Sequence, residues 1–209
     1  MKEVKGTVGY AQVISSFVEA TQAIPFDILH QDFLKFIPTS TSLILDIGAG
    51  IGRDAFELSQ RGHTVWAVEP LEEFRTVGNE LYQSANLIWR NDALPELMQL
   101  TACENQVDFV LCSGVWHHLN EKEQEFSMKR VSQLLKPGGL FALSLRNGPA
   151  GSGTHIFPID FVKTKKNAEV NGLEIVFNTD NQSSLMKKKK KVKWARLVLK
   201  KKDDFSTKK

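Results

Sequence analysis

The chain has 209 residues, which is long enough to bury a core and which the usual length prior assigns to one domain. Its composition is ordinary for a globular protein, and no apolar run approaches the length of a membrane span. The N-terminus lacks a hydrophobic signal core, so we expect a cytoplasmic protein. The two cysteines, Cys103 and Cys112, are too few for a disulfide scaffold and show no C-x-x-C spacing.

The net charge of +3 is distributed unevenly along the chain. Residues 187–209 contain eleven lysines, one arginine and two aspartates, a local charge of +10, so the rest of the chain sums to −7. This distribution argues against a uniformly basic protein that binds nucleic acid over its whole surface. The five consecutive lysines Lys187 to Lys191 leave open a local contact with a phosphate backbone.

Two helices are predicted before the first strand. Tyr10–Ala23 and Phe26–Phe36 both carry apolar residues at helical spacing, and Pro25 separates them. From residue 43 onward, strands and helices alternate, which is typical of a parallel sheet covered on both faces. The predicted strands are 43–47, 64–68, 87–90, 107–112 and 140–145.

The helices between these strands are predicted from apolar stripes and end signals. The first runs from Arg53 to Arg61 and ends at Gly62. The helix after the fourth strand begins at an expected capping box of Asn120 and Glu123. The expected buried stripe of the second helix is Leu71, Phe74, Val77 and Leu81, and that of the helix after the fourth strand is Phe126, Val131 and Leu134.

The last part of the chain predicts one helix and two strands. Pro158–Asn171 is expected to be helical, whereas Leu173–Asn178 and Val192–Leu199 alternate apolar and polar residues as strands do. The lysine run lies between these two strands, so its simplest interpretation is a solvated hairpin turn.

The segment LILDIGAGIGRDA, residues 43–55, combines an apolar strand with a glycine loop and the start of a helix. A dinucleotide loop requires G-x-G-x-x-G. Here the glycines Gly48, Gly50 and Gly52 give G-x-G-x-G, and Arg53 follows at once. Asp46 precedes the loop, where an acid repels a pyrophosphate and suits a ligand with a cationic amino group.

This segment resembles motif I of the class I S-adenosylmethionine-dependent methyltransferases. Four further segments match in order, so the resemblance covers roughly residues 39–147: VWAVEP, RNDALPEL, VDFVLCSGVWHHL and LLKPGGLFALSL. It implies an α/β, Rossmann-like, doubly wound and mostly parallel seven-stranded sheet with a C-terminal antiparallel hairpin. It also implies S-adenosyl-L-methionine as the cofactor and residues 1–40 as a helical lid over a domain of residues 41–209.

The resemblance assigns roles to three acids. Asp46 is expected to bind the methionine amino group directly or through water, with capping of the loop backbone as the alternative. Glu69 is expected to bind the two ribose hydroxyls. Asp92 is expected to accept from the adenine amine, with an N-cap role as the alternative. The other expected cofactor contacts are Gly48, Ala49, Gly50, Gly52, Pro70, Leu71, Ala93, Ser113, Gly114 and Val115.

The acceptor side is expected at the crevice after the fourth strand. His117 or His118 could deprotonate a hydroxyl or amine there, and the alternative is a loop histidine bonded to backbone. Arg146 could hold a carboxylate or phosphate, and the alternative is an ion pair with a surface acid. No metal site is expected, because adjacent histidines lack a third ligand. The other expected acceptor contacts are Tyr10, His30, Trp116, Asn147 and His155.

The fourth strand ends in CSGVW and not in the Asn/Asp-Pro-Pro-Tyr pattern with which similar enzymes grip a flipped base. Methylation of adenine or cytosine amines in DNA is therefore not expected. The sequence predicts a methyltransferase that acts on oxygen or nitrogen of a small-molecule acceptor, without a membrane partner. The alternatives are an RNA- or ribosome-associated methyltransferase that uses the basic tail, and a non-catalytic protein that binds the cofactor.

Overall fold

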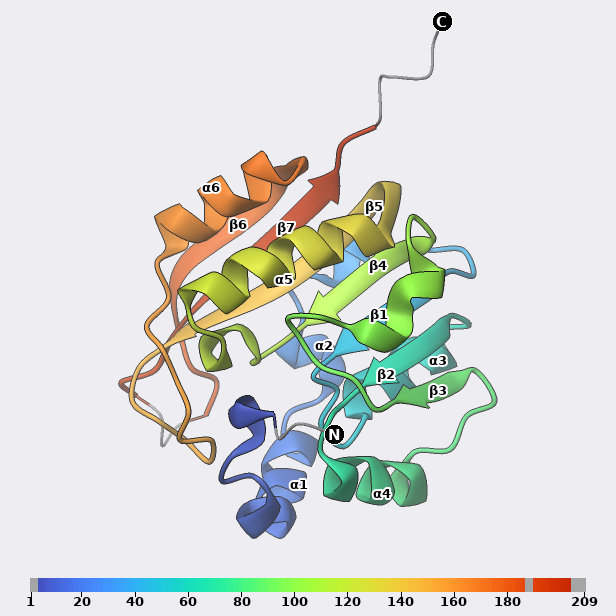
Figure 1. Cartoon of the computed structure of the whole chain (residues 1–209). Coiled ribbons are helices and arrows are strands. Elements are labelled where there is room, and N and C mark those ends of the chain that lie inside the picture. The colour runs from blue at the N-terminus through green and yellow to red at the C-terminus, as the bar shows by residue number, and fades with distance from the viewer. Residues whose placement is uncertain (1–3, 187–189, 204–209) are drawn as a thin grey trace, which may run out of the picture.

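The computed structural model describes residues 4–186 and 190–203 as one seven-stranded sheet with helices on both faces (Figure 1). The strand order is β3-β2-β1-β4-β5-β7-β6. Neighbours from β3 to β5 run parallel, and β7 pairs antiparallel with both β5 and β6. The strands are β1 (Leu43–Ile47), β2 (Thr64–Val68), β3 (Leu87–Arg90), β4 (Val107–Cys112), β5 (Leu135–Asn147), β6 (Leu173–Ser183) and β7 (Lys193–Lys201). This topology confirms the predicted fold class.

The helices are α1 (Ile14–Gln22), α2 (Phe26–Leu29), α3 (Arg53–Gln60), α4 (Glu72–Leu81), α5 (Glu121–Leu134) and α6 (Phe161–Val170). Short 3-10 turns accompany them: Lys5–Thr7, Ala11–Val13, Leu34–Phe36, Met98–Cys103 and Trp116–His118. None of the helices in the described part of the chain is long and apolar enough to cross a membrane.

The core is divided by the sheet into two clusters, because successive strand residues point to opposite faces. Leu45 and its alternate neighbours pack against α5 and α6, which lie over one face in Figure 1. Ile44 and its alternate neighbours pack on the other face against α3 and against Phe26 and Phe33 of the N-terminal region. Both faces are therefore covered, as the continuous apolar strands require.

The strand order reverses between β1 and β4, which are direct neighbours. The chain leaves β1 toward β2 and β3 on one side, and leaves β4 toward β5 on the other. The loops that follow Ile47 and Cys112 therefore separate at the carboxyl edge of the sheet and leave a crevice. Open α/β sheets bind their ligands at such a position.

The capping box that opens α5 is present. The Glu123 amide donates to Asn120 Oδ1 over 3.1 Å, and the Asn120 amide donates to Glu123 Oε2 over 2.7 Å. Cys103 and Cys112 are buried free thiols, which agrees with the absence of a disulfide pattern.

Three local predictions are wrong. Phe126 is 69% exposed and Leu81 is 45% exposed, so neither belongs to its predicted buried stripe. Tertiary packing decides which residues of a helix are covered, and here Met128 and Gly78 take the buried positions. The predicted helix Phe26–Phe36 is a four-residue helix followed by turns. It breaks at His30, whose side chain bonds to Asp54 over 2.8 Å.

Candidate functional site

Two cavities lie side by side at the carboxyl edge of the parallel strands. The first, about 470 Å³, is lined by Glu69 and Pro70 after β2 and is called the β2 cavity. The second, about 490 Å³, is lined by Trp194 and Arg196 of β7 and is called the β7 cavity. The lining residues common to both are Tyr10, Phe17, Gly48, Gly50, Ser113 and Gly114. A molecule in one cavity can therefore approach a molecule in the other across the glycine loop and the end of β4.

The glycine loop needs glycine for two different reasons. Gly50 has φ +55 and faces both cavities, so its backbone can touch a ligand in either of them. At Gly52, also with positive φ, a Cβ atom would lie 2.6 Å from the Trp89 ring. Gly50 is thus placed to contact a ligand, whereas Gly52 allows the loop to pack on β3.

Glu69 holds the glycine loop from the neighbouring strand. Its Oε2 accepts from the Gly50 amide over 2.9 Å, and its Oε1 accepts from the Leu71 amide over 2.8 Å. The residue is 5% exposed, and this burial raises its pKa to about 7 in spite of both bonds. Each oxygen retains a lone pair at the edge of the β2 cavity, where a ligand hydroxyl can donate.

Asp46 lies beneath the loop and does not line either cavity. Its Oδ2 is buried without a hydrogen-bond partner among the described residues. Burial and the nearby Asp54 carboxylate raise its pKa well above the ordinary range, although the Ala55 amide opposes the shift. The arrangement leaves an acceptor that only a small polar group, such as water or a ligand amine through water, can satisfy.

Asp92 lines the β2 cavity, and its carboxylate is already hydrogen-bonded to backbone. Its two carboxylate oxygens accept from the amides of Ala93 and Gln99 at 2.9 and 2.7 Å. The N-cap residue of the 3-10 turn Met98–Cys103 is Leu97, so Asp92 is not its N-cap, although it accepts from the Gln99 amide within that turn. Its position on the cavity wall leaves a ligand contact open. Ala93 lines the same wall.

A hydrogen-bonded chain of three residues stands at the junction of the cavities. His118 Nδ1 lies 2.8 Å from the His155 carbonyl oxygen, and His118 Nε2 lies 3.1 Å from the Tyr10 hydroxyl. A carbonyl can only accept, so Nδ1 carries the hydrogen and a neutral ring presents an unprotonated Nε2 to Tyr10. Burial lowers the pKa of His118, which favours that neutral ring, and burial raises the pKa of Tyr10.

The acceptor candidates divide into those that line a cavity and those that do not. His117 and Arg146 line the β7 cavity, and His118 and His155 line the β2 cavity. Trp116 is completely buried in the core against Phe141, because its 3-10 turn directs it inward.

His30 is also buried and bonds to Asp54, so neither His30 nor Trp116 reaches a cavity. Asn147 bonds to the backbone of Ile159 through both its amide nitrogen and its oxygen, at 3.0 and 2.8 Å. It therefore closes the loop after β5. Leu71 likewise lies outside both linings and begins α4.

Comparison with known proteins shows what this site resembles. A model of the methyltransferase domain matches residues 45–143, the stretch from β1 to β5. The part of the chain that forms the site is therefore similar to this domain, as the resemblance to the class I S-adenosylmethionine-dependent methyltransferases implied. An uncharacterised methyltransferase of Bacillus mycoides is 27% identical over 133 residues, which is 62% of this chain and 60% of that protein. One of Geobacillus is 29% identical over 110 residues, 52% of this chain and 50% of that protein. The matches thus span between half and three fifths of the length of these relatives.

Solved methyltransferases share the fold at low identity. A TehB-like methyltransferase of Corynebacterium glutamicum is 21% identical with a TM-score of 0.65, covering 92% of this chain and 96% of that one. The Burkholderia thailandensis 1,6-didemethyltoxoflavin-N1-methyltransferase, solved with its substrate and S-adenosylhomocysteine, is 20% identical with a TM-score of 0.65. The match covers 93% of this chain and 89% of the Burkholderia chain. These likenesses establish the fold of this chain.

The residues of this site fit S-adenosylmethionine by their own chemistry. A buried unpartnered carboxylate oxygen at Asp46 suits the ammonium group of the methionine part. Glu69 offers further acceptor capacity beside a loop without side chains. A cationic cofactor in the β2 cavity would thus meet Glu69 and exposed backbone, with Asp46 reached only through water.

Sequence reasoning missed four residues of the site. Phe17 and Phe74 stack with their ring centres 4.5 Å apart and line the β2 cavity. Trp194 and Arg196 line the β7 cavity from β7. Their only signal was periodicity, helical for the phenylalanines and alternating for the β7 pair, which identifies a buried face but not a cavity on it.

Proposed function

We propose that this chain transfers a methyl group from S-adenosylmethionine to an oxygen or nitrogen of a small-molecule acceptor. The observation that carries this proposal is the junction of the two cavities at Tyr10, Gly48 and Ser113. The β2 cavity takes the cofactor and the β7 cavity takes the acceptor. Methyl transfer is an in-line displacement, so adjoining cavities supply the positioning that the reaction needs.

On the cofactor side, Glu69 binds the ribose hydroxyls and holds Gly50 in position at the same time. Asp46 binds the methionine amino group through water, since its side chain does not line the cavity. Asp92 and Ala93 hold the adenine edge. The further contacts in this proposal are Gly48, Pro70, Ser113, Gly114 and Val115.

Bound S-adenosylmethionine supplies an electrophilic methyl carbon on a sulfonium. The chain supplies orientation and a path for the proton that the acceptor loses. His118 Nε2 is the base, because its Nδ1 hydrogen is committed to the His155 carbonyl. The Tyr10 hydroxyl stands between that base and the cavity junction, so it orients the acceptor and passes its proton to His118.

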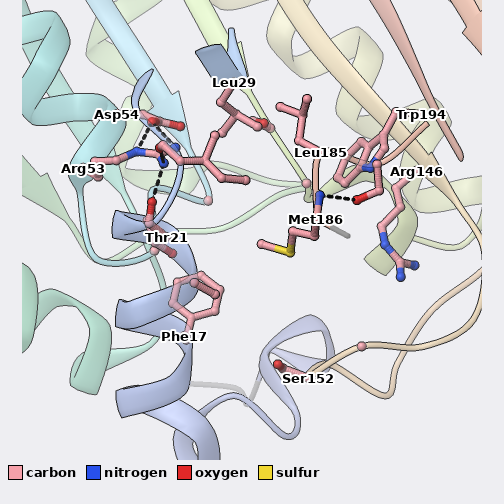
Figure 2. A pocket seen from close by; sticks show the side chains of 18 of the residues that line it. Phe17, Thr21, Leu29, Arg53, Asp54, Arg146, Ser152, Leu185, Met186 and Trp194 are labelled. Carbon is pink, nitrogen blue, oxygen red and sulfur yellow. Dashed lines mark hydrogen bonds and ion pairs between the residues drawn. The ribbon is translucent and has the colours of Figure 1, made fainter. Parts of the chain in front are cut away.

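The segment before β1 acts as a lid in this proposal. Tyr10 and Phe17 belong to it and contribute to both cavities. The guanidinium of Arg53 donates to the carbonyls of Thr21 and Ile24 at 2.6 and 2.7 Å, which fixes the end of α1 to the start of α3 (Figure 2). The acceptor is thereby enclosed, which favours a small molecule over a polymer.

A turnover assay tests the proposal. The protein is incubated with S-adenosylmethionine and pooled small alcohols, phenols, amines and carboxylic acids, and the release of S-adenosylhomocysteine is measured. We expect release with at least one pool, and its loss in a Tyr10→Phe, His118→Gln double variant that still binds S-adenosylhomocysteine. Binding of S-adenosylhomocysteine without turnover on any pool, together with turnover on RNA, would replace the small-molecule acceptor with an RNA substrate.

A further inference from the structure

Two arginines, Arg146 on β5 and Arg196 on β7, line the β7 cavity, and each is only 7% exposed. The strand register pairs Arg146 with Trp194 and Ser144 with Arg196, so the two arginines lie diagonally on one face of the sheet. In Figure 2, Arg146 extends from its strand into the open part of the cavity, near Trp194 and Met186.

These two guanidinium groups form no ion pair with the described residues. Arg146 Nη2 donates to the Pro149 carbonyl over 2.6 Å. Arg196 Nη1 is buried without a hydrogen-bond partner among the described residues. A buried cation in this situation is costly unless an anion reaches it.

The other charged groups of the cavity are already engaged. Arg53 donates to Asp54 over 2.7 Å, and Asp54 also bonds to His30. Asp32 lies near enough to oppose the lowering of the pKa of Arg196, whose main cause is burial. However, Asp32 Oδ2 accepts from the Gln182 amide over 2.9 Å and makes no ion pair in the described part of the chain.

Burial likewise lowers the pKa of Arg146, but a guanidinium stays charged at neutral pH. Both cations therefore face the cavity at the pH of the reaction. Their forked donors match the oxygens of a carboxylate or phosphate in a bidentate arrangement. Two aromatic rings also lie beside Arg196, whose guanidinium is 5.1 Å from the centre of the Trp194 ring and 5.8 Å from that of Phe33.

We infer that Arg146 and Arg196 form a subsite for an anionic group, carboxylate or phosphate, on the acceptor. This inference rests on the proposed function, because it assigns the β7 cavity to the acceptor. The cavity wall has an apolar part, formed by Leu29, Leu185 and Met186, beside polar residues such as Gln31 and Gln182, and we assign this apolar part to the body of the acceptor (Figure 2). The substrate class is thus an organic acid or a phosphate monoester with an apolar body.

Arg146 also lies close enough to Tyr10 and His118 for its charge to act on the pKa of both. An acceptor anchored by the arginines therefore has its apolar body and its nucleophile near the cavity junction. Arg146 and Arg196 are positioning residues in this account, since they bind a group remote from the atom that reacts.

The test uses protein saturated with S-adenosylhomocysteine and three matched probes: benzoate, phenyl phosphate and benzamide. Binding is measured by ligand-observed NMR and by the shift in thermal midpoint. We expect one or both anions to bind, and the neutral benzamide to bind at least about tenfold more weakly, as the loss of charge-assisted hydrogen bonds implies. Benzoate alone would identify a carboxylate site, and phenyl phosphate alone a phosphate site.

Four variants locate the binding: Arg146→Gln, Arg146→Lys, Arg196→Gln, and Arg61→Gln as a control arginine outside both cavities. We expect Arg146→Gln and Arg196→Gln to lose anion binding about tenfold or more, Arg146→Lys to lose less, and Arg61→Gln to match the parent. Without the anion, Arg196→Gln should be at least as stable as the parent, because it removes an uncompensated buried charge.

Two results would overturn the inference. One is equal binding of benzoate, phenyl phosphate and benzamide by the parent, or no binding of any, while S-adenosylhomocysteine still binds. The other is anion binding that persists unchanged in Arg146→Gln and in Arg196→Gln. Failure of S-adenosylhomocysteine itself to bind the parent would instead contradict the proposed function, so the two failures are distinguishable.

Discussion

The carboxylate of Glu69 accepts a hydrogen bond from the Gly50 amide over 2.9 Å, and this bond joins the end of β2 to the glycine loop after β1. The same carboxylate accepts from Leu71, so one side chain fixes two loops of the β2 cavity. A ligand that donates to Glu69 therefore meets an acceptor that is already oriented. This relationship links cofactor affinity to the protonation of a single buried acid.

The stability of the cofactor-free protein should fall as pH rises toward 7 because of Glu69. Burial raises its folded pKa from 4.5 to about 7, so the folded state binds the proton more tightly than the unfolded state does. The contribution of Glu69 to the free energy of unfolding is fully present below pH 4.5. It is lost as the pH rises through about 7, and the total loss is about 3 kcal/mol. The free energy of unfolding should be measured against pH in urea for the parent and for Glu69→Gln.

The difference between these two proteins isolates Glu69 from Asp46, whose raised pKa acts in the same direction. We expect the parent to lose stability relative to Glu69→Gln between pH 4.5 and 7. If the free energies of unfolding of the two proteins change in parallel over that range, Glu69 is ionised throughout it, and burial does not raise its pKa.

Replacement of Tyr10 by Phe or of His118 by Gln should lower turnover about 100-fold, the lower end of the range for general acid–base catalysis. In the parent, turnover should stay level with pH above 6.5, the ordinary pKa of histidine, because burial lowers the pKa of His118 below that value. His63→Gln is a matched control, since His63 is buried outside both cavities. A Tyr10→Phe enzyme with parental turnover would exclude the proposed proton path.

Replacement of Gly153 by Ala should reduce turnover without preventing cofactor binding. A Cβ atom there would lie 2.5 Å from Tyr10 Cε2 and 2.7 Å from His118 Cε1, so both rings must move. Turnover and S-adenosylhomocysteine affinity should be measured on the same preparation. Equal turnover in the two proteins would show that the distance between Tyr10 and His118 does not control the reaction.

Replacement of Lys187 to Lys191 by serine should leave cofactor affinity and small-molecule turnover unchanged. Lys187–Lys189 lie outside the described residues, and Lys190 and Lys191 are separated from β7 by Val192 alone. Five lysines in sequence provide charge without selective geometry. RNA binding should be assayed at two salt concentrations, because phosphate contacts give a steep salt dependence. Tight, salt-sensitive binding by the parent alone would support an RNA substrate.

The strands and the glycine loop could be predicted because their signals are local. The predicted bounds 43–47, 64–68, 87–90 and 107–112 coincide with β1 to β4, since each is an apolar run that ends in polar or glycine residues. Predictions that depended on tertiary contacts were less accurate, because the sequence does not show which elements pack together. Trp116 follows β4 as the sequence indicates, but only the fold determines that its turn directs it into the core.

Arg196 illustrates the same limit on the site. Alternation in the predicted strand places it on the face opposite Ala195 and Leu197, and a charged residue there is unusual for a buried face. Whether that face is packed or opens into a cavity depends on the N-terminal segment and on the loop after β5. Neither of these has a sequence pattern that determines its position.

Calorimetric titration with S-adenosylhomocysteine and with NAD tests the central claim most directly, in the parent, Glu69→Ala and the exposed control Glu73→Ala. The parent and Glu73→Ala should bind S-adenosylhomocysteine equally and NAD far more weakly, because the third glycine of G-x-G-x-G comes one residue early. Glu69→Ala should bind S-adenosylhomocysteine more weakly by about 1.5 to 3 kcal/mol, the range for hydrogen bonds to a charged group. Tighter binding of NAD by the parent, or unchanged affinity in Glu69→Ala with reduced stability, would contradict the account.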